Sequence, residues 1–302
     1  MGGRRPLHSL GLWMLAPVLL EYATEEQKLA HLPGIARGER RWCQGYSEPG
    51  AGSDLASLQT RAVRDPEDGD HYIVDGAKVW TSHANLADFM FCLVRTDPTV
   101  AKHDGISFVL IDMTSPGISV RPIQLISGSS PFCETRFEHV RVPVRNRIGR
   151  EGGGWTIAKR LLEHERSAIS MIRDAAPEET ESVVEMARRR GVLGDPILRD
   201  QIIQTEIEFL ANRLTLRRAR ETGARDLSSM FKLLGTELSK RKKELRVAIC
   251  GYQGLGWEGL GFADDELQIT REWLRSRANS IEGGTSEIQL NIIAKRVLGL
   301  PD

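Results

Sequence analysis

The chain has 302 residues, and its 41 lysines and arginines balance its 41 aspartates and glutamates, so the formal net charge is zero. It lacks the basic excess that nucleic-acid binding usually needs, and we expect no nucleic-acid partner. Four scattered cysteines without a C-x-x-C pair argue against a zinc site and against a dense disulfide framework, and they favour a reduced, cytoplasmic setting. They are Cys43, Cys92, Cys133 and Cys250.

Residues 1–41 are expected to be helical. The stretch MGGRRPLHSLGLWMLAPVLLEY loosely resembles a secretory signal, because two arginines precede an apolar run. The run is short and interrupted, which favours a buried helix over a membrane span. Thr24 and Gln27 have the spacing of a capping box, so a second helix is predicted directly behind the run. No other apolar run is long enough for a bilayer, and we expect no membrane span.

The pattern changes to β over residues 55–142. Short runs rich in valine, isoleucine and aromatic residues are separated by Gly, Pro and Asp, which predicts an antiparallel sandwich or barrel. These runs cover residues 71–82, 88–96, 106–113, 118–126 and 135–143. From about residue 150 the apolar period is helical, most clearly over 154–176 and 200–220. The order of elements predicts an α+β fold with segregated domains.

Two short stretches are candidates for holding a ligand. Residues 46–54, YSEPGAGSD, place a Gly-Pro turn between hydroxyl side chains. On composition alone a plain β-turn is favoured, although glycines also let a backbone approach a phosphate or a ring. Residues 78–82, KVWTS, place Trp80 in a strand beside two hydroxyl residues. Trp80 is either a core side chain or an aromatic wall for a planar ring.

Four stretches in the same order resemble the acyl-CoA dehydrogenases: YSEPGAGSDL, VWTS, VPVRNRIGREGGGW and IEGGTSEIQLNIIAKRVLGLP. The resemblance covers nearly the whole chain. It implies an acyl-CoA dehydrogenase-like fold with a remnant of the N-terminal helical domain (residues 1–41), a middle antiparallel β-domain (42–148) and a C-terminal helical bundle (149–302). It also implies FAD as cofactor and the removal of two hydrogens from the α and β carbons of an acyl-CoA thioester.

The resemblance assigns roles to single residues. Those that correspond to flavin contacts are Tyr46, Ser47, Trp80, Thr81, Ser82, Thr285 and Glu287. Ser53 corresponds to a residue near the pantetheine chain and is predicted to contact both the cofactor and the substrate. Residues that correspond to contacts with the adenosine diphosphate part of a neighbouring subunit's flavin are Arg190, Gln201, Gly251 and Tyr252. Leu193 stands where the family usually has phenylalanine, and Tyr252 stands where a second glycine is common.

The general base is expected at Glu165. The family usually places its base two residues before the threonine of the C-terminal motif, but that position is Gly283 here, and Glu282 is one residue off. Other members carry the base in a Glu-Arg pair on the long helix after the β-domain, which corresponds to Glu165 and Arg166. By helical spacing Glu165 shares an apolar stripe, although a salt bridge at the edge of the stripe fits the pattern too. The other members of the stripe are Ala158, Leu162, Ile169 and Ile172.

Arg166, Gly283 and Gly284 are assigned to the substrate site. Two adjacent glycines suit a turn or a close backbone approach, and the N–H of Gly283 is expected to polarise the thioester carbonyl. The resemblance implies electron transfer flavoprotein as electron acceptor and a homo- or hetero-oligomer, a dimer of dimers. It also implies about three or four further N-terminal helices, by usual helix lengths. Two alternatives to an active dehydrogenase stay open: a non-catalytic scaffold subunit or truncated paralogue, and an oxygen-using oxidase or monooxygenase on the same fold.

Overall fold

The computed structural model describes residues 10–175, 181–223 and 227–301, and over 166–175 it describes the main chain alone. The chain forms two compact units. The first contains residues 1–124 and 130–168, and the second contains residues 125–129 and 169–302. The division into three domains at 41/42 and 148/149 stays a prediction.

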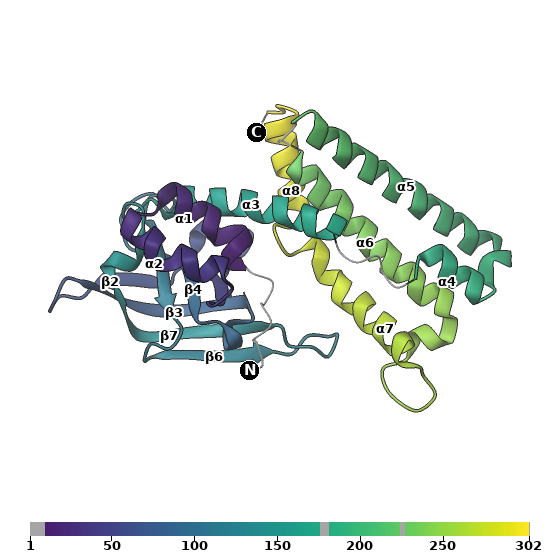
Figure 1. Cartoon of the computed structure of the whole chain (residues 1–302), viewed down its shortest axis with the longest axis horizontal. Coiled ribbons are helices and arrows are strands. Elements are labelled where there is room, and N and C mark those ends of the chain that lie inside the picture. Colours follow the sequence, from purple (N-terminus) through teal and green to yellow (C-terminus); the bar gives the residue numbers. More distant parts are fainter. Residues whose placement is uncertain (1–9, 176–180, 224–226, 302) are drawn as a thin grey trace. The chain divides into compact units, whose positions relative to one another are not determined.

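The first unit is built on one eight-stranded sheet (Figure 1). Its strands are β1 Trp42–Gly45, β2 Arg61–Arg64, β3 His71–Ser82, β4 Phe89–Arg95, β5 Ile106–Asp112, β6 Ile118–Ile123, β7 Phe132–Pro143 and β8 Arg147–Ile148. The pairing order is β6-β7-β3-β2-β4-β5-β8, and β1 pairs with β4. The five predicted strands are confirmed and pair antiparallel. The short strands β1 and β2 add parallel pairs with β4, and they escape prediction because four residues show too little alternation.

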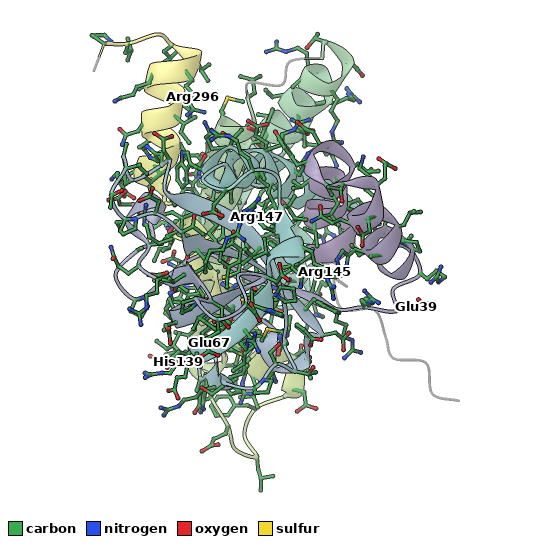
Figure 2. The ribbon with its side chains drawn as sticks, turned by 90° about the vertical axis from the view of Figure 1, so that its left-hand side faces the viewer. Glu39, Glu67, His139, Arg145, Arg147 and Arg296 are labelled. Carbon is green, nitrogen blue, oxygen red and sulfur yellow. The ribbon has the colours of Figure 1, made fainter. Side chains whose placement is uncertain are left out.

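Two helices precede the sheet, α1 Ala16–Tyr22 and α2 Glu25–Ala36. The predicted capping box at the start of α2 is confirmed: Thr24 Oγ1 accepts from the N–H of Gln27, and Gln27 Oε1 accepts from the N–H of Thr24. The same glutamine donates from Nε2 to the carbonyls of Arg145 and Arg147, both labelled in Figure 2. One side chain therefore starts α2 and ties it to the entry of β8.

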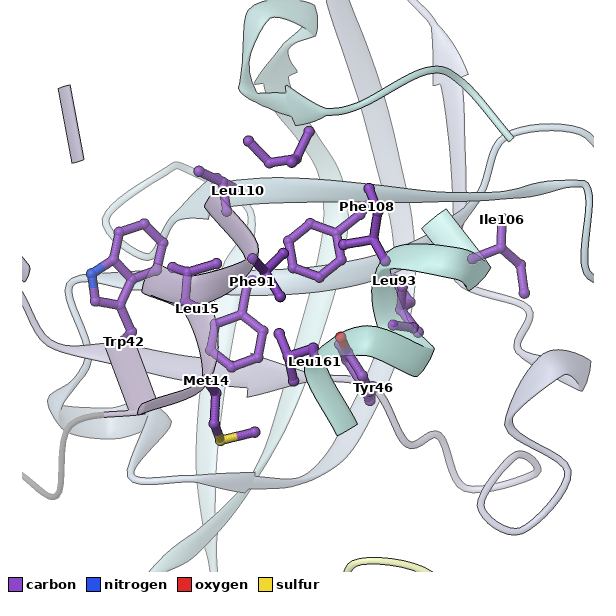
Figure 3. Packing of buried hydrophobic residues seen from close by; sticks show 14 of the residues in the cluster. Met14, Leu15, Trp42, Tyr46, Phe91, Leu93, Ile106, Phe108, Leu110 and Leu161 are labelled. Atoms are coloured by element: carbon purple, nitrogen blue, oxygen red, sulfur yellow. The ribbon is translucent and has the colours of Figure 1, made fainter. Parts of the chain in front are cut away.

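A core of apolar side chains lies between these helices, one face of the sheet and the first turns of α3 (Gly154–Ala175). Figure 3 shows the aromatic centre, where the rings of Phe91 and Phe108 stack 6.2 Å apart. Leu15 from the N-terminal run and Leu161 from α3 are fully buried here, which confirms that the run packs into a core. Burying each such side chain contributes about 1.5–3 kcal/mol.

The second unit is helical in the part that the structure describes. Its α-helices are α4 Val183–Arg189, α5 Pro196–Glu221, α6 Ser228–Cys250, α7 Asp264–Ser276 and α8 Ser286–Ile292. The helix α6 packs against both α5 and α7 (Figure 1). Asp195 starts α5 by accepting from the main-chain N–H groups of Ile197 and Leu198. Pro196 lies between, at the first helical position, where a missing N–H is harmless. Across the described residues, no helix is long and apolar enough to cross a membrane.

Candidate functional site

The strand β3 is bulged next to Trp80. Lys78 pairs with Thr135 of β7 while Thr81 pairs with Cys133, so two residues, Val79 and Trp80, oppose a single residue of β7. A bulge bends its strand and re-aims the side chains on it. Trp80 has a φ of 60°, a strained conformation for a non-glycine residue, and it is 55% exposed. The interpretation of Trp80 as a core side chain is therefore wrong, and its indole is open to a planar ligand.

The residues after Trp80 differ in what they can offer. Thr81 is fully buried, and its hydroxyl donates to the carbonyl of Cys133 at 2.7 Å and lies 2.9 Å from the Thr135 hydroxyl. A contact from Thr81 to a cofactor would therefore use its main chain. Ser82 is half-buried. The ring of Phe132 meets Trp80 edge to face at 6.3 Å and restrains the exposed indole.

The stretch 46–54 forms a tight turn beside this bulge. Glu48 and Ala51 exchange both main-chain hydrogen bonds, at 2.9 and 3.1 Å. The N–H of Val79 donates to the carbonyl of Ser47 at 2.9 Å, so the structure brings the two predicted ligand-holding stretches together. Ser47 is half-buried and Ser53 is exposed. The predicted turn is therefore confirmed, and it lies next to the strained Trp80 rather than in an isolated surface loop.

A buried ion pair, absent from the sequence predictions, fixes this arrangement. Lys78 Nζ lies 2.8 Å from Glu48 Oε1 and also donates to the carbonyl of Tyr46 at 3.1 Å, and the two side chains are 0% and 7% exposed. Glu48 accepts further bonds from the N–H groups of Gln59 and Thr60 at 2.6 and 2.9 Å. Burial alone would raise the pKa of Glu48, but the Lys78 charge and these hydrogen bonds outweigh it and hold the pKa below 4.5.

A signal for this pair was present in the sequence. Tyr72, Val74 and Lys78 fall on alternate positions of one strand, and all three are buried. A lysine at an inward position of a strand needs a buried partner, because an isolated ammonium group is costly to desolvate. The nearest carboxylate in the ligand-holding stretches is Glu48.

Glu165 lies in α3, one turn after the buried Leu161. It is half-buried, and its Oε2 atom is buried. The predicted apolar stripe is confirmed as far as the side chains are described, since Ala158 is fully buried and Leu162 packs against the core. Three further members of the predictions have side chains outside the described residues: Arg166, Ile169 and Ile172.

Tyr46 points into the core rather than toward the surface. It is 4% exposed, and its ring meets Phe91 and Phe108 edge to face, at 6.1 and 6.5 Å. Burial raises the pKa of Tyr46 well above its usual value of 10, and the negative charge of Glu165 raises it further. A flavin contact from Tyr46 would therefore use its main chain, while its hydroxyl lies within the electrostatic influence of the base candidate.

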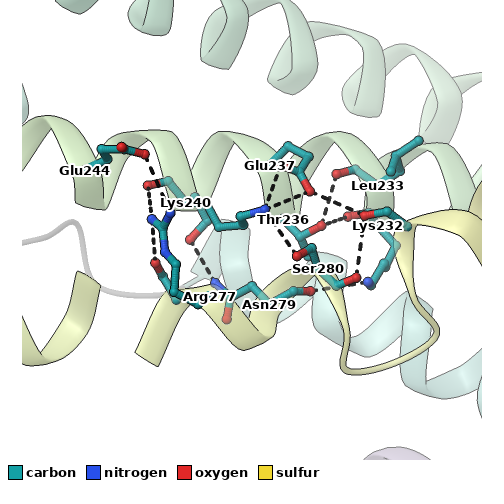
Figure 4. Close-up of polar contacts among 12 residues, drawn as sticks. Lys232, Leu233, Thr236, Glu237, Lys240, Glu244, Arg277, Asn279 and Ser280 are labelled. Carbon is teal, nitrogen blue, oxygen red and sulfur yellow. Dashed lines mark hydrogen bonds and ion pairs between the residues drawn. The ribbon is translucent and has the colours of Figure 1, made fainter. Parts of the chain in front are cut away.

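The second unit holds the C-terminal motif in a network of its own. Gly283 and Gly284 have φ values of 65° and 91°, which confirms the predicted turn. Lys232 Nζ donates to the carbonyl of Gly284 at 2.6 Å and to that of Asn279 at 3.2 Å (Figure 4). Gln289 Nε2 donates to the carbonyls of both glycines, at 3.2 and 3.3 Å. A Cβ on Gly284 would come within 2.4 Å of that nitrogen and displace the Gln289 side chain, and the φ of 91° is what favours glycine at this position.

The polar residues around this turn have distinct surroundings. Glu282 is exposed, and its Oε2 accepts from Arg275 at 2.7 Å, an ordinary surface ion pair. Thr285 caps α8 by accepting from the N–H of Ile288 at 3.3 Å. Glu287 is exposed in the first turn of α8, where its own N–H and the Thr285 hydroxyl lower its pKa. Neither carboxylate has the buried setting of Glu165.

The residues predicted to serve a neighbouring subunit's cofactor also lie in the second unit. Arg190 ends α4 and pairs with the buried Glu266 at 2.7 Å. Gln201 is exposed on α5. Gly251 ends α6 with a φ of 58°, and Tyr252 behind it is 92% exposed. Their accessibility leaves these residues able to meet another chain, except that Arg190 is already engaged within its own.

Comparisons with known proteins agree with this architecture. Residues 43–140 match the acyl-CoA dehydrogenase middle domain, and residues 152–298 match the acyl-CoA dehydrogenase C-terminal domain. Acyl-CoA dehydrogenase IpdE1 of Mycolicibacterium smegmatis is 37% identical over 305 residues, which cover 98% of this chain and 76% of that protein.

Two solved structures extend the likeness to three dimensions. The structure named Tcur3481-Tcur3483 steroid ACAD superposes with a TM-score of 0.85 at 35% identity, covering 97% of this chain and 76% of that one. The ChsE4-ChsE5 complex from Mycobacterium tuberculosis superposes with a TM-score of 0.79 at 30% identity, covering 100% and 79%. With both domains matched and relatives above 30% identity along almost its full length, the chain belongs to the acyl-CoA dehydrogenase family.

Proposed function

We propose that this chain binds FAD and removes hydrogens from the α and β carbons of an acyl-CoA thioester, with Glu165 as the general base. The observation that carries the proposal is the bulge at Trp80. It presents a strained, exposed indole beside the Ser47 turn, and a buried ion pair fixes both. Strain of this kind persists where the surrounding structure imposes it, and it gathers at functional sites.

These residues fit a flavin ring. The indole of Trp80 supplies an apolar wall, and two half-buried serines supply hydroxyl groups. Ser82 follows Trp80 by two residues, and Ser47 lies beside the strand, where its carbonyl accepts from the N–H of Val79. FAD, when bound, would accept the hydride from the β carbon of the substrate. The protein's part is to hold the ring and to exclude other orientations.

Glu165 would take the proton from the α carbon. A general base works best when it is partly withdrawn from water and still reaches its substrate, and Glu165 is half-buried with one oxygen fully covered. The main-chain N–H of Gly283 would polarise the thioester carbonyl, because a fixed donor stabilises the charge that builds up on that oxygen. Ser53 and Arg166 are proposed contacts of the substrate.

The substrate class rests on the relatives. A solved relative is named as a steroid dehydrogenase of this family, which makes a steroid-derived acyl-CoA the first candidate. A straight-chain acyl-CoA is the second. Comparing the two as substrates of the FAD-loaded protein separates them, since the preferred thioester bleaches the flavin faster at equal concentration.

The assignment of the base is tested by Glu165→Gln. Losing a positioned base costs about 10²–10⁴ in rate, so flavin bleaching by an acyl-CoA should fall by at least that lower bound while FAD stays bound. Glu163→Gln is the matched control, because Glu163 lies on the same helix with a 51% exposed side chain paired to Arg160. Glu282→Gln should also keep most of the rate, and Gly283→Glu should restore part of it to Glu165→Gln. Full activity in Glu165→Gln overturns the assignment.

The chain is also proposed to assemble with a second chain through α5. Four exposed apolar side chains follow one another at spacings of four, three and four, which places them on one stripe of the helix. They are Ile203, Ile207, Leu210 and Leu214, between 43% and 55% exposed. Two solved relatives are named as pairs of different chains, so the partner is another copy or a related chain. Ile207→Glu should lower the molar mass in light scattering, and Glu206→Gln on the same helix should not.

Two outcomes would favour the alternatives. A protein that binds FAD in its assembled form yet is bleached by no acyl-CoA is a scaffold subunit. Rapid reoxidation of the reduced flavin by air, in place of transfer to electron transfer flavoprotein, indicates an oxidase. Reduction by an acyl-CoA followed by slow reoxidation in air supports the dehydrogenase.

A further inference from the structure

The hydroxyl of Tyr46 is buried in the core of the first unit, and no group in the described part of the chain hydrogen-bonds to it. A polar group taken out of water without a partner costs free energy, and native cores leave few of them. A phenylalanine would fill the same space without that cost. The hydroxyl therefore needs an explanation beyond packing.

Tyr46 is held from two sides. The edges and faces of Phe91 and Phe108 enclose its ring, and Lys78 Nζ donates to its main-chain carbonyl at 3.1 Å. Lys78 is itself locked by Glu48. The ring has little freedom to turn away, so the direction of its hydroxyl is set by the fold.

The hydroxyl faces α3. Figure 3 shows the oxygen of Tyr46 directed toward that helix beside Leu161, which belongs to the same buried cluster. Glu165 lies four residues after Leu161 and therefore on the same side of the helix, with its Oε2 buried. The charge of Glu165 acts on Tyr46, in addition to burial, to raise the pKa of the phenol, which stays protonated and able to donate.

We propose that Tyr46 is the positioning residue of the general base: its hydroxyl donates to the Glu165 carboxylate once substrate fills the site and holds that carboxylate in one orientation. This rests on the proposed function, in which Glu165 takes the α-proton. Hydrogen bonds that serve catalysis are often long or unmade in the free enzyme and form in the complex. The Tyr46 hydroxyl is already buried and oriented in the free protein, so it can donate as soon as the substrate complex forms.

Among the described residues, the other titratable groups near this spot are either neutral in the core or charged at the surface. Cys92 of β4 is close enough for a charge on it to act on Tyr46, but burial raises the pKa of its thiol to about 11, so it is neutral. Burial, helped by the Arg160 charge, lowers the pKa of His164, which is neutral near pH 7. The remaining charges, of Arg160 and Glu163 on α3 and Glu21 on α1, form one surface cluster of ion pairs.

The test is Tyr46→Phe with Tyr72→Phe as matched control. Tyr72 is also fully buried in this unit, but its hydroxyl donates to Glu151 at 2.6 Å and accepts from Arg147 at 2.8 Å. Flavin bleaching by an acyl-CoA should rise with pH as Glu165 loses its proton. Without the donor the carboxylate is less stabilised, so Tyr46→Phe should move that rise to higher pH by about one unit. Tyr72→Phe should leave the profile in place.

Thermal unfolding separates this role from a structural one. Tyr46→Phe should keep or raise the Tm, because it removes a buried group that lacks a partner, whereas Tyr72→Phe should lower it. A double-mutant cycle of Tyr46→Phe and Glu165→Gln in Tm should be additive in the free protein and non-additive with an acyl-CoA bound, because the hydrogen bond forms only when the site is filled; this readout needs no activity. An unmoved pH profile with a cycle that stays additive in the complex overturns the role of Tyr46 and leaves the base untouched if Glu165→Gln is inactive. An active Glu165→Gln overturns the proposed function itself.

Discussion

Two buried lysines each hold a segment of the candidate site, the turn at residues 46–54 in the first unit and the double-glycine turn in the second. Lys78 in β3 donates to the carbonyl of Tyr46, ahead of the tight turn of the first unit, and Lys232 in α6 donates to the carbonyl of Gly284 in the second. The hydrogen bonds that tie each lysine to its segment differ. Lys78 has the Glu48 carboxylate at 2.8 Å, whereas Lys232 also donates to the carbonyl of Asn279 at the end of a short 3₁₀ segment.

The difference teaches how each segment is held. An ammonium–carboxylate pair with further hydrogen bonds rigidifies a core but makes each partner dangerous to remove, because the survivor is a buried charge. A lysine on main-chain carbonyls resembles a helix C-terminal cap, and removing it leaves neutral groups that water can reach more cheaply. Removing the lysine should therefore lower the unfolding free energy more in the first unit than in the second.

The largest effect is expected from Lys78→Met. The variant leaves Glu48 as a charge without its ammonium partner at 7% exposure, which typically costs about 3–5 kcal/mol of unfolding free energy. Adding Glu48→Gln should recover a large part of that loss. Denaturant unfolding measures both, and FAD titration should show weakened binding in the single variant. A loss below about 1 kcal/mol would mean that the Lys78–Glu48 pair contributes no more than a surface ion pair.

Lys232→Met should have a middle-sized effect. It removes the Lys232 donor from the Asn279 carbonyl and leaves the Gly284 carbonyl with the Gln289 amide alone, which costs about 1–3 kcal/mol. Lys240→Met is the matched control: this lysine lies two turns further along α6 (Figure 4), and it is 22% exposed and pairs with the half-exposed Glu237. Pairs of this kind contribute about 0–1 kcal/mol. If both variants lose the same stability, burial of Lys232 is not what holds the glycine turn.

Much of the fold could be predicted from the sequence because its signals are local. The capping box at Thr24 and the double glycine at Gly283 depend on neighbours a few residues away, and both are confirmed. The long strands are runs of six residues or more that are rich in β-branched and other apolar residues, either alternating as in β3 or continuous as in β4 and β5. The three shortest strands lack such runs, since β1, β2 and β8 have four residues or fewer and exist only through their partners.

The candidate site was harder to predict because its decisive contacts are distant in sequence. Glu48 and Lys78 are 30 residues apart, and Lys232 and Gly284 are 52 apart. The direction of Trp80 depends on a register shift against β7, which no local pattern encodes. Tyr46 was assigned a flavin contact from its motif, but its side chain is set by packing against Phe91 and Phe108. That flavin contact stays a prediction for its main chain.

The smallest effect, and the one that most sharpens the comparison, is confined to acid. The folded-state pKa of Glu48 lies below 4.5, so its ionised form contributes stability that is fully present above about that pH. The contribution is lost as pH falls through the lowered pKa, because the folded state must then take up a proton that the unfolded state binds more readily. The stability difference between the parent and Glu48→Gln should accordingly shrink below pH 4.5. The difference between the parent and Lys232→Met should change less, since the carbonyls of Asn279 and Gly284 do not titrate and the Lys232 charge is only the smallest cause of the lowered pKa of Glu287. Denaturant unfolding from pH 3 to pH 7 measures both curves. Parallel curves would show that the charge of Glu48 does not make the Lys78 contacts differ from the Lys232 contacts in their pH dependence.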